Sequence, residues 1–414
     1  MSKQQLSERL CAWIDQHFEE EVGVLQQLIR IPTDTPPGNN APHADAVAEL
    51  VQSWGWQAEK HAVPADQVRD YGMQSITNLI VRRPYGDGGP TLALNAHGDV
   101  VPPGEGWTHD PYGGEVADGR IYGRAAAVSK SDFASYIFAT RALESLGAAL
   151  RGAVELHFTY DEEFGGVLGP GWLLEQKLTR PDYVLAAGFS YNVVTAHNAC
   201  LQFEVTVHGR ATHGSMPDTG HDALQAANAI LNAIYGALPG LKDIRSSIPG
   251  ISHPTMIVGR IDGGTNTNVV PGKVVLKMDR RMIPEEDPAQ VEAGVRKLIE
   301  DAVAGLPGIR VEIRRLLLAR ALRPLPGHEK LVDSLLRNAE QVMGETLTTN
   351  GSALYTDARL YGEAGIPVVL FGAGPRTLME SNAKQADENL ALDDLKKATK
   401  VVALMLLDFL GPQD

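Results

Sequence analysis

Charged side chains that could perform acid–base or metal chemistry gather in two short segments of this 414-residue chain. His97 and Asp99 are separated by one residue, and Glu162 and Glu163 are adjacent. An imidazole so placed can bind a metal while the nearby carboxylate orients the ring. Adjacent glutamates can act separately, one as a metal ligand and the other as general base for a bound water. An isolated glutamate pair is more commonly a solvated surface feature, but the two segments together predict a hydrolytic site.

Apolar stretches predicted to be β-strands precede both segments. Residues 91–96 lead directly to His97, and residues 153–160 lead directly to Asp161. Open α/β sheets place their functional groups at the carboxyl ends of strands. We therefore expect the imidazole and the carboxylates to meet at one edge of a sheet.

The remaining pattern predicts an α/β fold that is interrupted by an insertion. Helical spacing of apolar residues occurs at 5–30, 44–55, 130–147, 328–343 and 391–410, and further strands are expected at 78–81 and 366–371. From about residue 199 the pattern changes to alternating strands near 201–208, 254–262, 273–281 and 309–317, with a helix at 221–236. Such alternation is typical of an antiparallel sheet with one wet face. We expect a split α/β domain (1–198 and 319–414) with a mixed, mostly parallel sheet and flanking helices, and an inserted α+β domain (199–318).

Length and charge limit the possible partners. A chain of 414 residues is expected to form two domains. Its net charge of −14 argues against nucleic acid or an anionic membrane and favours a small-molecule substrate. The first residues lack an apolar signal core, so a cytoplasmic location is expected. Cys11 and Cys200 belong to no metal or redox motif and are expected to be buried, reduced thiols.

Several further motifs accompany the two segments in order along the chain. They are Ile121-Tyr122-Gly123-Arg124, Val207-His208-Gly209-Arg210-Ala211-Thr212-His213-Gly214, Gly263-Gly264-Thr265-Asn266-Thr267-Asn268, Asp279-Arg280-Arg281 and Thr356-Asp357-Ala358-Arg359. With them, nearly the whole chain resembles the zinc-dependent exopeptidase and aminoacylase family, which includes acetylornithine deacetylase, succinyl-diaminopimelate desuccinylase, carnosinase-type dipeptidases and glutamate carboxypeptidase. The resemblance implies a catalytic α/β domain whose inserted lid commonly mediates dimerisation. A homodimer through residues 199–318 is therefore expected.

The resemblance also implies roles for residues that match the family motifs. His97 would be a metal ligand, Asp99 its orienting carboxylate, Glu162 the general base and Glu163 a ligand of a second metal. His213 would help to hold the substrate carbonyl or the developing oxyanion; its alternative is a surface histidine in a turn.

Two lid residues would contact the substrate in the same family. Asn268 and Arg281 match positions that bind the substrate, commonly at its carboxylate, a task that suits a guanidinium. Arg281 could equally be a strand residue that pairs with a nearby acid.

Three positions where the family has metal ligands carry other residues here. Val128 stands where the resemblance implies a metal-bridging aspartate, Phe189 where it implies an acidic ligand, and Lys384 where it implies a histidine. A tightly held catalytic zinc takes three protein ligands, and His97 with Glu163 supplies two. The expected cofactor is therefore zinc or another divalent metal, at most one per chain, or none.

Other residues are candidates to replace the missing ligands. Asp132 lies one helical turn beyond Val128 and could reach back to the site or serve only at the helix start. His197 is a weaker candidate. Lys384 could place an ammonium beside Glu163 where a cation would sit, or point to solvent.

These observations predict a hydrolase of amide C–N bonds in small N-acyl-amino-acid or dipeptide-like substrates, by metal-assisted water attack with Glu162 as general base. One alternative is a metal-independent enzyme in which Glu162, Lys384, Ser129 or His213 handles protons for a different reaction. Another is a catalytically silent homologue that binds a small carboxylate.

Overall fold

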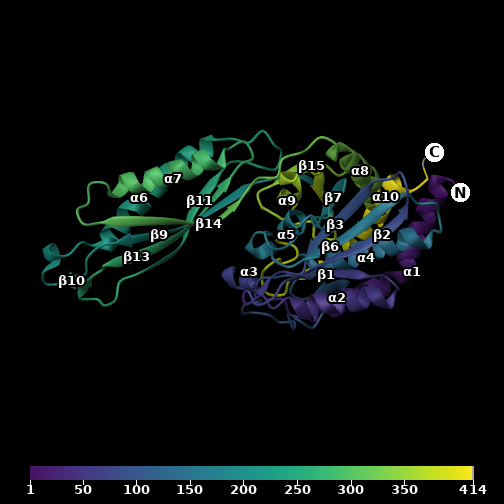
Figure 1. Ribbon diagram of the computed structural model, residues 1–414, viewed down its shortest axis with the longest axis horizontal. Helices are drawn as coiled ribbons and strands as arrows, with labels where there is room; N and C mark the ends of the chain where they lie inside the picture. Colours follow the sequence, from purple (N-terminus) through teal and green to yellow (C-terminus); the bar gives the residue numbers. More distant parts are fainter. Residues whose placement is uncertain (413–414) are drawn as a thin grey trace. The chain divides into compact units, whose positions relative to one another are not determined.

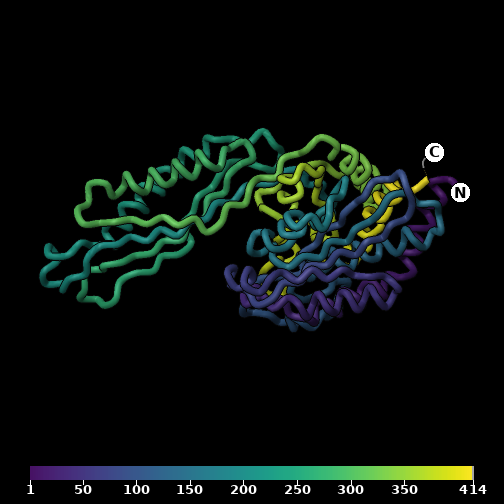
Figure 2. The backbone as a smooth tube through the Cα atoms, in the orientation of Figure 1, coloured from purple at the N-terminus to yellow at the C-terminus, as the bar shows by residue number. Residues whose placement is uncertain are grey.

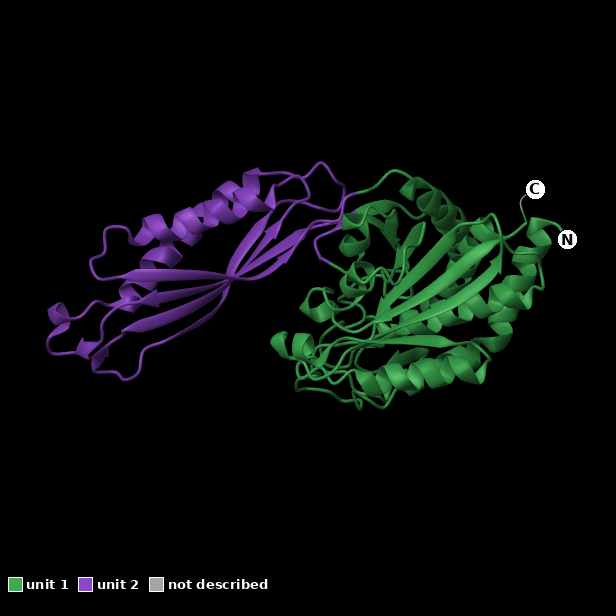
Figure 3. Ribbon diagram, viewed as in Figure 1, with its two compact units in different colours: residues 1–195, 324–350, 356–414 green, residues 196–323, 351–355 purple. Residues whose placement is uncertain are grey.

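The computed structural model describes residues 1–412, which form two compact units (Figure 3). Unit 1 contains residues 1–195, 324–350 and the chain from 356 onwards, and unit 2 contains residues 196–323 and 351–355. Unit 2 thus contains the insertion expected at 199–318 and extends a few residues beyond it. No helix within residues 1–412 is long and apolar enough to cross a membrane.

An eight-stranded mixed sheet forms the centre of unit 1 (Figure 1). Its strands, in spatial order, are β1 (Ala58–Ala62), β2 (Thr77–Gly86), β6 (Gly152–Thr159), β3 (Thr91–His97), β7 (Tyr183–Ala186), β16 (Val368–Leu370), β8 (Val193–His197) and β15 (Thr349–Ser352). The central pairs β6–β3, β3–β7 and β7–β16 are parallel, whereas β1–β2, β2–β6 and β16–β8 are antiparallel. A small second sheet contains β4 (Glu115–Ala117), β5 (Arg120–Tyr122) and β17 (Asn389–Ala391). The mixed α/β architecture expected from the sequence is confirmed.

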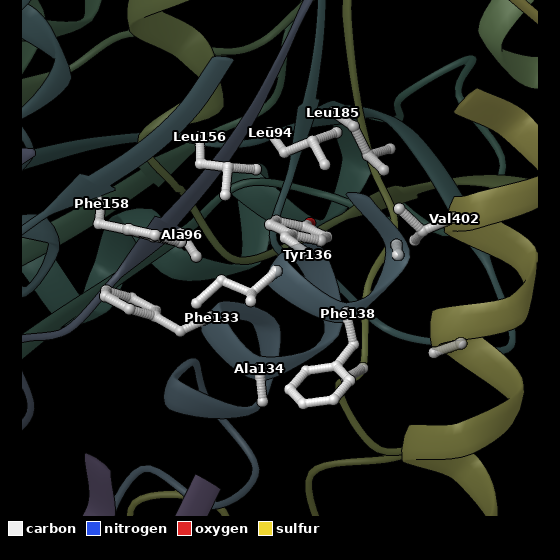
Figure 4. Packing of buried hydrophobic residues seen from close by; sticks show 14 of the residues in the cluster. Leu94, Ala96, Phe133, Ala134, Tyr136, Phe138, Leu156, Phe158, Leu185 and Val402 are labelled. Carbon is white, nitrogen blue, oxygen red and sulfur yellow. The ribbon is translucent and has the colours of Figure 1, made fainter. Parts of the chain in front are cut away.

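Helices flank the large sheet. The long ones are α1 (Lys3–Ile29), α2 (Ala41–Ser53), α4 (Lys130–Ser145), α8 (His328–Met343) and α10 (Leu392–Leu410), and the short ones are α3 (Ala65–Asp70), α5 (Pro170–Glu175) and α9 (Ala358–Glu363). Helix α4 packs on β3 and β6, and α1 and α10 pack on α4 and on each other, so that the first and last helices of the chain are neighbours (Figure 2). The core between α4 and the sheet combines aliphatic and aromatic side chains, and Phe133 stacks on Phe158 with ring centroids 4.2 Å apart (Figure 4). This packing fixes the strand ends that carry the candidate site.

Glu21 is an acidic residue buried among these helices. Its Oε1 accepts a hydrogen bond from the Thr399 hydroxyl of α10 at 2.6 Å. Burial raises the pKa of Glu21 to about 8, against the opposing effect of the Thr399 hydrogen bond. The ordinary value is near 4.5. The folded protein therefore keeps a proton on Glu21 that the unfolded chain loses as the pH rises through 4.5. Stability falls as the pH rises from about 4.5 to about 8 and stays at the lower level above that.

Replacing Glu21 by glutamine should remove this pH-dependent loss. We expect E21Q to match the wild type near pH 4 and to exceed its unfolding free energy by about 5 kcal/mol near pH 9. Guanidinium unfolding followed by tryptophan fluorescence measures the difference in unit 1, because all five tryptophans lie in that unit. The control is E19Q, on an exposed position of the same helix. If the difference in unfolding free energy between E21Q and the wild type is equal at both pH values, the prediction is contradicted.

Unit 2 consists of an antiparallel sheet and two helices. The sheet order is β11 (Thr255–Gly263), β13 (Lys273–Met282), β9 (Ala199–His208) and β14 (Arg310–Ala319). Along β9, buried residues alternate with partly exposed ones, as the alternating sequence predicted. The helices α6 (Ala223–Asp243) and α7 (Pro288–Val303) pack on each other and on this sheet (Figure 1).

Helix α7 was not expected from the sequence. It begins at Pro288, after Asp287, whose side chain accepts a hydrogen bond from Gln290 N at 3.0 Å. An aspartate cap followed by proline is a common helix start and was the available signal. Unit 2 also contains the short strand pair β10 (Thr212–His213) and β12 (Val269–Val270). Short 3-10 turns lie at η1 (Glu162–Phe164) in unit 1 and at η2 (Pro217–Thr219) in unit 2.

Candidate active site

The candidate active site of unit 1 lies where strands β3 and β6 end. These strands are parallel, and their register pairs His97, the last residue of β3, with Thr159, the last residue of β6. Gly98 N continues the pairing by donating to Thr159 O at 2.8 Å. The two segments predicted to carry the chemistry therefore leave the sheet at the same edge.

Asp99 is fully buried and joins these two segments. Its Oδ1 accepts a hydrogen bond from Glu162 N at 3.2 Å, and its Oδ2 accepts one from Glu163 N at 3.0 Å. Its Oδ1 also lies 3.5 Å from His97 Nδ1, which is 3.0 Å from the Asp99 carbonyl oxygen. One carboxylate thus positions the imidazole and the backbone of both glutamates.

Two glycines complete the turn that carries the glutamates. Gly165 and Gly166 follow η1 and both have positive φ, a conformation that favours glycine. A Cβ on Gly166 would lie 1.9 Å from Asp357 Oδ1, so glycine allows the Asp357 carboxyl to approach the turn. Arg359 supports the same turn by donating from Nη2 to the carbonyl oxygen of Gly165.

Asp161 and Asp357 are two buried acids of this region that were not expected as site residues. Burial raises the pKa of both carboxyl groups, and so do neighbouring carboxylates, Asp99 for Asp161 and Asp161 for Asp357. Among the described residues, neither oxygen of Asp357 has a hydrogen-bond partner. Both residues belong to motifs that carried the family resemblance, which was the available signal for them.

Glu162 faces the imidazole of His97. Its Oε2 lies 3.9 Å from His97 Nε2. Burial disfavours a charged imidazole, but the carboxylates of Glu162, Asp99 and Glu163 outweigh burial and raise the pKa of His97 to about 10. Burial is also the main cause that raises the pKa of Glu162, with His97 opposing it. The arrangement thus pairs a mostly buried carboxylate, whose side chain is 13% exposed, with a cationic imidazolium.

Lys384 lies beside Glu163. Its Nζ is 2.6 Å from Glu163 Oε2, and the Lys384 side chain is 50% exposed whereas that of Glu163 is 9% exposed. Burial disfavours the charged ammonium, but Glu163 and Glu162 outweigh it and raise the pKa of Lys384. Of the two alternatives for Lys384, the structure thus has the contact with Glu163.

A buried ion pair holds the loop of Lys384. Glu388 accepts a hydrogen bond from Lys384 N at 3.2 Å and one from Ala127 N at 3.1 Å. Arg124 Nη1 lies 2.5 Å from Glu388 Oε2, and both side chains are only 2% exposed. The Arg124–Glu388 pair thus ties the loop of Lys384 to the segment that precedes Val128.

The other two substituted positions offer no charged or metal-binding group. Val128 has an alkyl side chain, and Phe189 forms a β-bridge with Gly374. Ser190, next to Phe189, is buried, and its hydroxyl has no hydrogen-bond partner among the described residues. None of the three side chains can replace a carboxylate ligand.

The candidate replacement ligands make other contacts. Asp132 accepts a hydrogen bond from Ala373 N at 2.7 Å, and burial raises its pKa to about 7. Ser129 Oγ donates to the carbonyl oxygen of His97 at 3.0 Å. His197 belongs to unit 2, where its Nδ1 lies 2.9 Å from the Asn198 carbonyl oxygen. Asp132 therefore supports the loop at Ala373, a role that neither expectation for this residue included.

The donors in this site do not fit a tightly held divalent metal. Within residues 1–412, no group of three His, Cys, Asp or Glu side chains is arranged to bind a metal ion. Glu163 Oε2 is already in contact with the Lys384 ammonium, and the two carboxylate oxygens of Asp99 accept backbone hydrogen bonds. A catalytic zinc site normally has three protein ligands, and His97 and Glu163 supply at most two.

In unit 2, two of the predicted substrate-binding residues lie next to each other. His213 pairs with Val269 across β10 and β12, and Gly214 N donates to the carbonyl oxygen of Asn268 at 2.7 Å. His213 is exposed, and its Nδ1 lies 2.7 Å from Ser215 Oγ. The predicted roles of His213 and Asn268 stay predictions.

Arg281, the third predicted substrate-binding residue, has partners within unit 2. Its Nε lies 2.7 Å from Asp279 Oδ1, and its guanidinium lies 5.3 Å from the centre of the Tyr355 ring. Arg281 thus pairs with a nearby acid, which was the second of its two expected roles.

Both cysteines are free thiols. Cys200 is buried and contacts Asp279. Cys11 is only partly buried, contrary to expectation.

The fold is a split α/β domain with an inserted α+β unit, and its site has an imidazole and glutamates at adjacent strand ends. This combination is the architecture of a class of amide-bond hydrolases. Residues 93–408 match the model of peptidase family M20/M25/M40, and the chain belongs to this family. The resemblance recognised from the motifs is confirmed.

Three known proteins illustrate what the chain is similar to in sequence or in fold. It is 28% identical over 392 residues to a succinyl-diaminopimelate desuccinylase from Methylobacterium radiotolerans, across 92% of this chain and 94% of that protein. It superposes on human carnosine dipeptidase 1 with a TM-score of 0.76 and 19% identity, across 97% of this chain and 99% of that one. A dinuclear metal-binding M20 peptidase from Bacillus subtilis gives a TM-score of 0.64 and 18% identity, across 95% and 99%. The chain is thus a member of a hydrolase family.

Proposed function

We propose that this chain hydrolyses the amide C–N bond of a small N-acyl-amino-acid or dipeptide-like substrate, with Glu162 as general base. The placement of Glu162 supports this most: its backbone is held by Asp99, and its carboxylate faces His97 at 3.9 Å. The substrate class is supported by the relatives, which are named a desuccinylase of succinyl-diaminopimelate and a carnosine dipeptidase.

In this reaction Glu162 removes a proton from a water molecule. The water oxygen forms a bond to the carbonyl carbon, and the carbonyl oxygen becomes an oxyanion. The C–N bond then breaks, and the proton moves from Glu162 to the departing nitrogen, which leaves a carboxylic acid and an amine. A general base works best when its pKa lies near the working pH, and burial moves the pKa of Glu162 upwards in that direction.

His97 would stabilise charge in the same reaction. Its raised pKa keeps the imidazole cationic at neutral pH, and a fixed cation near a developing oxyanion lowers the barrier. A metal-assisted form of the reaction, as the resemblance implied, would need a third ligand that the described residues do not offer.

The expected homodimer is a proposal that a single measurement tests. Strand β11 is an edge of the unit 2 sheet, with Ile257 58% and Ile261 50% exposed. Light scattering coupled to gel filtration should give twice the mass of the 44.6 kDa chain. A monomer would contradict the proposal.

The proposed activity is tested with three substrate sets: N-succinyl-amino acids, N-acetyl-amino acids and dipeptides. The released primary amine is measured by reaction with o-phthalaldehyde, with heat-denatured protein as the control. We expect turnover on at least one set. Binding by calorimetry without turnover on any set would identify the chain as a silent carboxylate-binding homologue instead.

A further inference from the structure

The position of Lys384 distinguishes this site from that of a metal-binding relative. The ammonium lies 2.6 Å from the nearly buried carboxylate of Glu163. The charges of Glu162 and Asp99 also act on it. Lys384 therefore brings one positive charge to the place where three acidic side chains converge.

We infer that the Lys384 ammonium replaces a divalent cation in this site and donates a hydrogen bond to the substrate carbonyl oxygen, so that hydrolysis proceeds without a metal. This inference rests on the proposed amide hydrolysis and adds, beside His97, a second cation that stabilises its oxyanion.

Three observations separate Lys384 from an ordinary surface ion pair. Its acidic partner is 9% exposed, whereas surface pairs join two solvated groups. Its backbone has a φ of 62°, which is uncommon for a residue other than glycine. Its backbone N–H is bound to Glu388, which is itself fixed by the buried Arg124. The surrounding structure thus determines where the ammonium lies.

The ammonium also has capacity left for a substrate. A lysine ammonium has three N–H donors, and Glu163 Oε2 is the one hydrogen-bond acceptor for it within residues 1–412. The Lys384 side chain is half exposed, so a carbonyl oxygen could approach it from solvent. In the reaction above, Lys384 would face the oxygen that gains negative charge while Glu162 handles the proton.

A divalent ion would compete directly with this ammonium. It would need the Glu163 oxygen that Lys384 contacts, and it would place its own two positive charges beside the positive charge of the Lys384 ammonium. Only His97 and Glu163 were expected as ligands, and the substitutions at Val128 and Phe189 remove two expected carboxylates. The loss of negative charge at those positions and the gain of positive charge at Lys384 both reduce the need for a metal cation.

The test combines zinc titration with kinetics on chelator-treated protein. Calorimetry with zinc chloride should show no stoichiometric binding to the wild type. In turnover assays, K384M should lower kcat by about 100-fold, as loss of one oxyanion donor does, and K384R should retain more activity than K384M. The matched control is K60M, which breaks the exposed Lys60–Asp45 pair of unit 1 and should leave kcat unchanged. Circular dichroism checks that each variant is folded.

Each outcome decides the inference. Stoichiometric zinc binding that raises kcat, or an unchanged kcat in folded K384M, would overturn it. If the wild type hydrolyses none of the substrates, the proposed function fails, and the zinc titration alone tests the inference. Stoichiometric zinc binding would then overturn the replacement of the metal by Lys384, and absence of zinc binding would support it. Turnover that depends on Glu162 but not on Lys384 would retain the proposed function and refute this inference.

Discussion

Replacing Glu162 by glutamine should lower kcat for amide hydrolysis by about 10²–10⁴-fold, the usual contribution of a general base. Glutamine keeps the shape of the side chain and the backbone hydrogen bond to Asp99, but it cannot accept the proton of the attacking water. The measurement is the initial rate of amine release on the best substrate of the panel. Substrate affinity should change much less than kcat.

The stability of this variant should be equal to or above that of the wild type. Burial, Glu163 and Asp99 all raise the pKa of Glu162, so the charged carboxylate is costly in the folded state. The matched control is E175Q, which changes an exposed glutamate of α5. Full activity of E162Q would remove Glu162 from the mechanism.

Replacing Arg124 by methionine should destabilise unit 1 by about 3–5 kcal/mol, because it leaves the Glu388 carboxylate buried without its cation. Arg124 also donates to the carbonyl oxygen of Pro103 at 3.0 Å and lies 5.1 Å from the centre of the Trp107 ring. Guanidinium unfolding followed by tryptophan fluorescence reports the change. Activity should also fall, since Glu388 holds the backbone of Lys384.

Two measurements separate the cost of the unpaired Glu388 carboxylate from the loss of packing around Arg124. They are the pH dependence of the unfolding free energy and the stability of a double variant. Burial already raises the pKa of Glu388, and Arg124 opposes that rise, so R124M should raise the pKa further. The stability deficit of R124M should then be largest at high pH and shrink as the pH falls and Glu388 takes up a proton. The double variant R124M/E388M should recover part of the loss. A deficit in R124M that is independent of pH would contradict this account.

The placement of the main site residues could be predicted because it follows from local pattern. His97 and the glutamates each end an apolar strand, and neighbouring parallel strands present their ends at the same edge. The motif resemblance also placed Lys384 and Glu163 at one site, but it left open whether the ammonium contacts Glu163 or points to solvent; the structure shows the contact.

The contacts that hold the site residues in place could not be predicted in the same way. The Arg124–Glu388 pair joins residues 264 positions apart, and no local pattern indicates such a contact. Helical spacing would have put Asp132 one turn beyond Val128, but helix α4 begins only at Lys130. The partner of Asp132 is Ala373 N, which only the tertiary fold brings near. The side chain of Arg281 was similarly open to two interpretations until its Asp279 partner was known.

The most direct test of the account is the rate of amide hydrolysis by the wild type as a function of its metal content. Metal per chain is measured by inductively coupled plasma mass spectrometry on samples from chelator-treated to zinc-loaded, and kcat is measured on the same samples. The account predicts turnover that is independent of the metal content. A kcat that rises in proportion to bound metal, and vanishes in its absence, would contradict it.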